Sequence, residues 1–158
     1  MRVESGELSG MNSTDVRWVQ RFGNFERAYL LLSGALQGKD VSEFDDLQRE
    51  GLIQRFEFTF ELLWKTLKDY LDFEEVSIEI ISPKGVIKAA AASNILGIIG
   101  VRAECLLSML EARNAVLNVY DEDRFVRVLS DVKENHLAEI TGIYLFFKGK
   151  INHVGSLN

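Results

Sequence analysis

The sequence is poor in cysteine and proline, with one of each among its 158 residues. A single cysteine cannot form a disulfide within the chain, and its presence alone fits a reducing compartment such as the cytoplasm. A single proline leaves room for long uninterrupted helices. No apolar run reaches the ~20 residues that span a bilayer, and the N-terminus lacks the pattern of a signal peptide. We therefore expect a cytoplasmic protein that does not enter the membrane.

The motifs of several enzyme classes are also missing. The single cysteine and the two histidines do not have the spacing of metal ligands, and there is no glycine-rich phosphate loop or nucleophile-elbow serine. Cys105 falls on an apolar helical stripe, so we interpret it as a small core residue. The net charge of −6 argues against broad nucleic-acid binding, although a local basic cleft is compatible with it. We expect no metal and no cofactor.

Helical periodicity is what the sequence has in abundance. Four long segments repeat apolar residues every three or four positions, which is typical of amphipathic helices. They cover residues 13 or 14 to 36, 47 to 71, about 95 to 117 or 118, and 122 to about 148. A shorter helix is predicted from Pro83 to Ala92, with Ser82 as its N-cap.

These segments predict an all-α fold: an antiparallel up-and-down four-helix bundle with a short extra helix before helix three. The length is sufficient for one domain with its own core. We place the bundle at residues 13–150, between a flexible N-terminal arm at 1–12 and a flexible tail at 151–158.

Arg113 is the residue that this periodicity explains least. On a helix over residues 98–117, with about 100° per residue, it lies inside an apolar arc. An unpaired buried charge is very costly, so Arg113 needs a partner or a water-filled cleft. Two interpretations stay open: an ion pair with Glu57 or Glu61 of helix two, or a clamp for a carboxylate or phosphate ligand.

The candidate binding site is built around this arginine. Polar residues follow it closely, and we assign to the site Arg113, Asn114, Asn118, Tyr120, Asp121 and Glu122. Asp121 is also the predicted N-cap of the fourth helix.

Two further features carry open alternatives. His136 lies in the apolar stripe of the fourth helix and is either a core histidine bonded to a neighbour or a catalytic residue. Phe58 and Leu62, four positions apart on the far side of helix two, either form a protein interface or only flank the core.

Several segments resemble the nucleotidyltransferase substrate-binding protein family, a branch of the HEPN four-helix bundles related to HepT toxins. They begin with Arg17-Trp-x-Gln-Arg-Phe-x-Asn-Phe25 and include the long block from Gly51 to Leu71. Ser82-Pro83, Leu110-Glu-Ala-Arg-Asn114 and Tyr120-Asp-Glu122 complete the set. The resemblance covers roughly residues 17–147.

The resemblance implies a homodimeric bundle that binds a small nucleotidyltransferase. HepT-type members are metal-independent ribonucleases with an Arg-x4-His-x-Tyr motif on helix three, and two copies of the motif meet across the dimer. The partner can silence such a toxin by adenylylating the motif tyrosine. In this chain the motif arginine corresponds to Arg113 and the tyrosine to Tyr120, whereas Asn118 stands at the histidine position.

Asn118 decides between the functions that the resemblance allows. Asparagine cannot exchange a proton near neutral pH, so the acid–base role of the histidine is absent. The leading hypothesis is therefore a non-catalytic substrate-binding subunit of a two-component nucleotidyltransferase, with a nucleotide or RNA phosphate at Arg113. The alternative is a weakened or inactive ribonuclease toxin of a toxin–antitoxin pair that uses Arg113 with His136 or a water. A third interpretation is a dimeric scaffold in which Arg113 only pairs with a glutamate.

Overall fold

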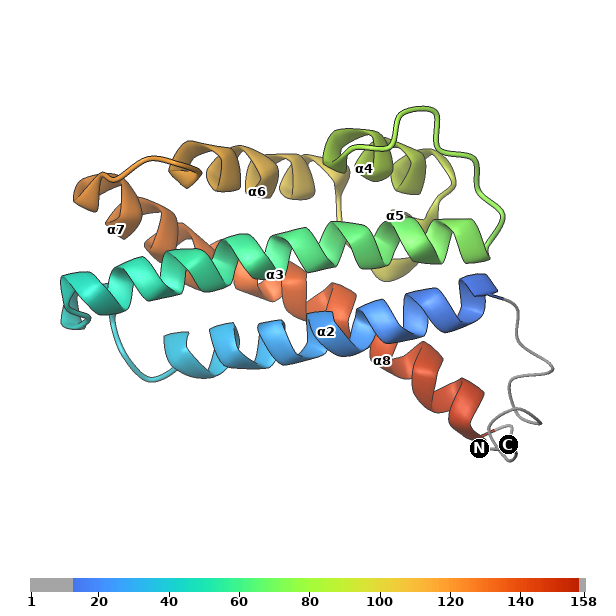
Figure 1. The fold of residues 1–158 in the computed structure, drawn as a ribbon, viewed down its shortest axis with the longest axis horizontal. Coiled ribbons are helices and arrows are strands. Elements are labelled where there is room, and N and C mark those ends of the chain that lie inside the picture. The colour runs from blue at the N-terminus through green and yellow to red at the C-terminus, as the bar shows by residue number, and fades with distance from the viewer. Residues whose placement is uncertain (1–12, 157–158) are drawn as a thin grey trace.

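The computed structural model describes residues 13–156, which are almost entirely helical (Figure 1). The elements in chain order are α2 (Ser13–Leu36), the 3-10 turn η1 (Val41–Glu43), α3 (Asp46–Phe73), α4 (Pro83–Ala92), α5 (Ile95–Ile99), α6 (Ala103–Val116), α7 (Glu122–Asp131), the π-helical turn η2 (Val132–His136) and α8 (Leu137–Ser156). The predicted arm at 1–12 and the last two residues of the predicted tail lie outside the described residues.

The helices form an up-and-down bundle. In Figure 1, α2 and α3 lie side by side and antiparallel, α4 and α6 run along the opposite edge of α3, and α7 and α8 return behind them. The predicted all-α bundle, including the short helix before helix three, is confirmed. Within the described range no helix has both the length and the apolar character of a membrane span.

Side-chain caps define where three helices begin. The Asp45 carboxylate accepts the Gln48 amide hydrogen at 2.8 Å, and the Gln48 side chain accepts from the Asp45 amide at 2.9 Å. This reciprocal capping box starts α3. Ser82 Oγ accepts from the Gly85 amide at the start of α4, and the Asp121 carboxylate accepts from the Arg124 amide at the start of α7. The two predicted N-caps, Ser82 and Asp121, are confirmed.

The prediction of one long third helix is wrong. The chain leaves helical geometry at Gly100, whose φ is 90°, and α6 starts only at Ala103. A left-handed residue closes a helix well when it is glycine, and the Gly100 amide donates to the Leu96 carbonyl at 2.9 Å. The apolar arc that was derived for one helix over residues 98–117 therefore applies only to the part of it that forms α6. Ile98, on the expected apolar arc, is exposed.

The fourth predicted helix differs at two places. It contains the π-helical turn η2, which adds backbone to a helix that otherwise runs on from α7 to α8. Its end is also later than expected, since α8 continues past Lys150 to Ser156. The apolar stripe of this segment, in which His136 was placed, is buried along its whole length: Phe125, Leu129, Val132, His136, Ile140, Ile143 and Phe147.

Candidate functional site

Arg113 of α6 reaches across to α3 and pairs with Glu61. Its Nη1 lies 3.5 Å from Glu61 Oε2, and its guanidinium stacks over the Phe60 ring, 5.5 Å from the centroid. The side chain is only 16% exposed, and its Nε has no hydrogen-bond partner among the described residues. Of the two glutamates proposed as partners, Glu61 forms the ion pair.

Glu61 is held by more than Arg113. Trp64 Nε1 donates to Glu61 Oε2 at 3.0 Å, and Lys65 Nζ lies 3.1 Å from Oε1. Burial raises the pKa of Glu61, but the hydrogen bonds from Trp64 and Lys65 and the charges of Lys65 and Arg113 outweigh it and lower the pKa. The ionised form of Glu61 is therefore favoured by its neighbours.

The pKa of Glu57, one turn earlier on α3, is shifted in the opposite direction. Burial raises the pKa of Glu57, and the charge of Arg113 only partly opposes this effect. Arg113 thus lies near two carboxylates and bonds to one of them. A phosphate at this position would have to displace Glu61 and approach Glu57. The negative charge of these carboxylates would repel it.

A cavity of about 400 Å³ opens beside this group. It is lined by Glu50, Ile53, Gln54, Glu57, Val116, Asn118, Val119, Tyr120 and Phe125. Its charged lining residues are the two glutamates, so the cavity is acidic. Such a surface favours hydrogen-bond donors and cations over the phosphate groups of RNA.

Asn118 adopts a left-handed conformation, with φ at 58°, directly after the end of α6. Asparagine tolerates this region better than most residues, because its short side chain can bond locally. Asn118 and Tyr120 both line the cavity, whereas Asn114 is exposed on α6. The structure therefore brings together Asn118 and Tyr120, while Asp121 is used as a helix cap.

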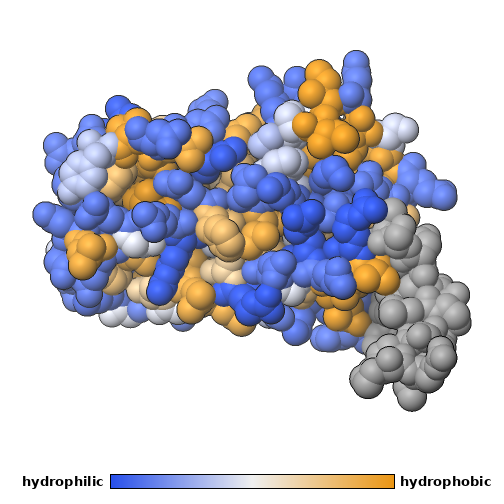
Figure 2. All heavy atoms as spheres, viewed as in Figure 1, coloured by the Kyte–Doolittle hydropathy of each residue, from blue (hydrophilic) through white to orange (hydrophobic). Residues whose placement is uncertain are grey.

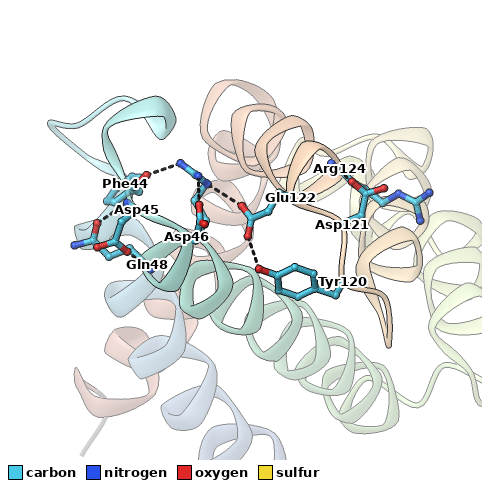
Figure 3. Close-up of polar contacts among 9 residues, drawn as sticks. Phe44, Asp45, Asp46, Gln48, Tyr120, Asp121, Glu122 and Arg124 are labelled. Atoms are coloured by element: carbon cyan, nitrogen blue, oxygen red, sulfur yellow. Dashed lines mark hydrogen bonds and ion pairs between the residues drawn. The ribbon is translucent and has the colours of Figure 1, made fainter.

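Tyr120 belongs to a chain of polar contacts that ends at the start of α3 (Figure 3). Its hydroxyl donates to Glu122 Oε1 at 2.9 Å, and Glu122 Oε2 lies 3.4 Å from Arg49 Nε. Arg49 also pairs with Asp46 at 2.7 Å and donates to the Phe44 carbonyl. These contacts tie the segment before α7 to the first turn of α3.

Arg49 was not predicted as part of the site. Its i,i+3 spacing from Asp46 was a signal for a local pair, but its contact with Glu122 joins residues 73 positions apart. Periodicity within one helix contains no information on such a contact.

The hydrogen bond to Glu122 raises the pKa of Tyr120 from 10.0 to about 12, with added contributions from desolvation and nearby carboxylates. An ionised phenolate would face the Glu122 carboxylate, so the neutral phenol is favoured. We expect Glu122→Gln to lower the pKa of Tyr120 part of the way toward 10.0. A pH titration of the tyrosine ring-carbon resonances by NMR measures it.

Tyr144 is the internal control for this titration. Its pKa is likewise raised to about 12, chiefly by its hydrogen bond to Glu26, so Glu122→Gln should leave it unchanged. A Tyr120 pKa that is the same in both proteins would contradict the assigned hydrogen bond.

His136 is a buried histidine held by its own helix. Its Nε2 lies 3.0 Å from Asp131 Oδ2 and its Nδ1 3.7 Å from Glu139 Oε1. Neither nitrogen makes a well-aligned hydrogen bond among the described residues. These contacts match the interpretation of His136 as a core histidine. The groups next to its ring are the carboxylates of Asp131 and Glu139, and Arg113 is not among them.

Phe58 and Leu62 differ in exposure but share one groove. Phe58 is 63% exposed, whereas Leu62 is 8% exposed and belongs largely to the core. Both line a groove of about 810 Å³ between α2 and α3. Figure 2, viewed as Figure 1, shows apolar side chains over this region, and further apolar patches near α4 and near α6 and α7, on a mostly hydrophilic face.

The fold and the contacts of Arg113 define an all-α helical bundle with an interhelical ion pair beside an acidic cavity. Residues 20–148 match the family described as nucleotidyltransferase substrate binding protein like, and the chain belongs to this family. The family description supports a role in nucleotidyltransferase substrate binding.

A crystal structure of a protein from Thermus thermophilus is similar to this chain. The identity is 28% and the TM-score 0.63, with 75% of this chain and 94% of that chain covered. No curated protein matches the sequence.

Proposed function

We propose that the chain is a non-catalytic subunit of a two-component nucleotidyltransferase. It acts in the cytoplasm as a homodimer, docks a small nucleotidyltransferase and holds that enzyme's substrate. The state of Arg113 is the observation that carries this proposal. The motif arginine is engaged by Glu61 and Phe60, beside a cavity that contains Glu50 and Glu57.

The same observation weighs against the ribonuclease alternative. Cleavage of RNA without a metal needs a cation free to hold phosphate and a group that exchanges a proton. Arg113 is paired, and Asn118 supplies no proton near neutral pH. His136 lies between Asp131 and Glu139 on its own helix. These contacts favour binding over catalysis.

The cavity residues have separate roles in the proposed complex. Asn118 and Tyr120 offer hydrogen bonds to a neutral part of the substrate or to the partner protein. Glu122 and Arg49 hold Tyr120 in place, and Arg113 stabilises the α3–α6 contact from which the site is built. A phosphate of a nucleotide or RNA binds at Arg113 only if it displaces Glu61.

A binding measurement and a cleavage assay test the proposal together. We expect the purified chain to bind the small nucleotidyltransferase in isothermal titration calorimetry, and to sediment as a dimer. We also expect it to leave single-stranded RNA intact, with no difference between the wild type and Arg113→Ala. Arg127→Ala, at an exposed position on α7, is the matched control. RNA cleavage that disappears in Arg113→Ala and persists in Arg127→Ala would establish the ribonuclease alternative instead.

A further inference from the structure

The groove between α2 and α3 has an apolar floor that the described residues leave open. Phe58 and Leu31 are 63% and 57% exposed, and both line the groove together with the buried Leu62. Single exposed apolar residues are ordinary on a protein surface, whereas apolar side chains gathered in one hollow mark an interaction site. Figure 2 shows this apolar region between α2 and α3.

Gly51 keeps one end of the groove open. It lies in the interior of α3, where glycine is less favourable than alanine because it loses more backbone freedom on folding. A Cβ at this position would meet no atom within 4 Å. Packing within the bundle therefore does not require glycine, and the space above Gly51 is available to an occupant.

Two arginines at the groove form no ion pair with a carboxylate of the described residues, although the charge of Arg27 helps to lower the pKa of Glu26. Arg27 contacts the Asn24 side chain, and Arg55 donates to the Leu31 carbonyl at 3.3 Å, but neither pairs with a carboxylate of residues 16–152. Glu26, the neighbour of Arg27 in sequence, is bonded to Lys148 at 2.9 Å. In a chain with a net charge of −6, these two cations beside an apolar floor are a local exception.

We propose that this groove docks an acidic amphipathic helix of the nucleotidyltransferase partner, with its apolar face on Phe58 and its carboxylates on Arg27 and Arg55. This inference rests on the proposed function and names the docking surface. The α3 side of the groove runs from Gly51 to Leu62, which is about 16 Å at the rise of an α-helix. That length accommodates the anchors of two to three helical turns, the usual pattern of a helix in a groove.

A second copy of the chain is a poorer occupant. A two-fold contact centred on the groove would place Arg27 and Arg55 of both protomers in one interface, where the groove lining has no carboxylate to pair with them, and like charges oppose association. RNA is also a poorer occupant. Two arginines provide few phosphate contacts, and an acidic protein repels the rest of the backbone.

Two variants test the groove by different means. Gly51→Trp fills the open end, and because tryptophan is a better helix former than glycine it should not unfold α3. Arg27→Glu/Arg55→Glu reverses both charges. Their matched controls are Gly149→Trp on α8, where a Cβ also meets nothing within 4 Å, and Arg127→Glu on α7. The probe is the purified nucleotidyltransferase, titrated calorimetrically at an ionic strength of about 0.1 M, where the screening length is roughly 10 Å.

We expect Gly51→Trp to weaken binding at least about 30-fold, because the indole would occupy the space that the docked helix needs at this end of the groove, a loss of the size found at interface hot spots. We expect the charge reversal to weaken it about 100-fold or more, since it places carboxylates opposite carboxylates in the interface. The controls should stay within about twofold of the wild type. The wild-type affinity should also fall more steeply with added salt than that of the charge-reversed protein.

Other outcomes separate this inference from the proposed function. If the wild type fails to bind the transferase, both are overturned. If all four variants bind like the wild type, the complex forms elsewhere, and only the groove assignment is overturned. Sedimentation of Gly51→Trp as a monomer beside a dimeric wild type would make the groove the homodimer interface. Binding of single-stranded RNA that disappears with the charge reversal would assign the arginines to nucleic acid; either result overturns the inference.

Discussion

Phe147→Ala is expected to lower the free energy of unfolding by roughly 3–5 kcal/mol, the range for removing a large buried aromatic side chain. Phe147 of α8 is fully buried. Its ring lies 5.2 Å from Tyr70, 5.6 Å from Trp18 and 6.1 Å from Phe22, measured between centroids. One substitution therefore leaves a cavity between α2, α3 and α8, and rings from three helices cannot all move to fill it. Urea denaturation followed by circular dichroism measures the loss.

Leu145→Ala is the matched control for Phe147→Ala. Leu145 is on the same helix but exposed, so its truncation should change stability by no more than about 0.5 kcal/mol. All proteins must be compared at one concentration, because the proposed dimerisation would make apparent stability depend on concentration. Phe147→Leu keeps most of the buried volume, so it should lose less than the alanine variant. Equal losses for Phe147→Ala and Leu145→Ala would contradict the assigned core.

Asp69→Asn is expected to cost roughly 3 kcal/mol of stability, at the lower end of the range for breaking a buried ion pair. Asp69 of α3 is 1% exposed, and its Oδ2 accepts from Arg21 Nε of α2 at 3.0 Å. Its Oδ1 lies 3.5 Å from Lys68 Nζ. The amide has the same shape but no charge, so Arg21 loses its paired anion and Lys68 loses one neighbouring carboxylate. Water reaches part of Arg21 and Lys68, which places the loss at the lower end of the range.

Asp72→Asn removes a neighbouring but more exposed carboxylate, so it separates the effect of burial on stability from the effect of charge. Asp72 lies 3.1 Å from Lys68 and 4.0 Å from Arg17, but it is substantially more exposed than Asp69. Its substitution should therefore cost less than about 1 kcal/mol. A double-mutant cycle with Arg21→Gln and Asp69→Asn isolates the pair, and a coupling near zero would exclude the Arg21–Asp69 contact as a source of stability.

Much of the fold follows from residue periodicity because burial in a bundle repeats with the helical turn. The first predicted helix, now α2, repeats apolar residues every three or four positions, and this stripe is buried throughout: Trp18, Phe22, Phe25, Tyr29, Leu32 and Leu36. The break at Gly100 was missed for a physical reason: Ile98, Val101 and Cys105 continue the apolar repeat across it, while the chain changes direction. A glycine with a positive φ ends a helix without altering the hydropathy pattern.

Sequence periodicity predicted which face of its own helix a site residue occupies, but not which residue of another helix it contacts. Periodicity marked Arg113 as needing a partner and suggested a glutamate of the second helix, such as Glu57 or Glu61. It did not distinguish between these glutamates, because one helical turn separates them, and the rotation of α6 against α3 decides which one is reached. Arg49 and its contact with Glu122 depend on how two distant segments pack, and that contact has no local signature.

The π-helical turn η2 gives the last helix of the bundle a place where its length can change. A π-helical turn holds more residues than an α-helical turn, so η2 takes up extra chain between α7 and α8. Loss of one residue within Val132–His136 can therefore be absorbed by a return to α-helical hydrogen bonds, and Ile140, Ile143 and Phe147 keep their place in the core. The same loss inside α8 would rotate everything beyond it by about 100° and expose that face. The tolerance of this helix to the loss of a residue is thus concentrated in a single turn.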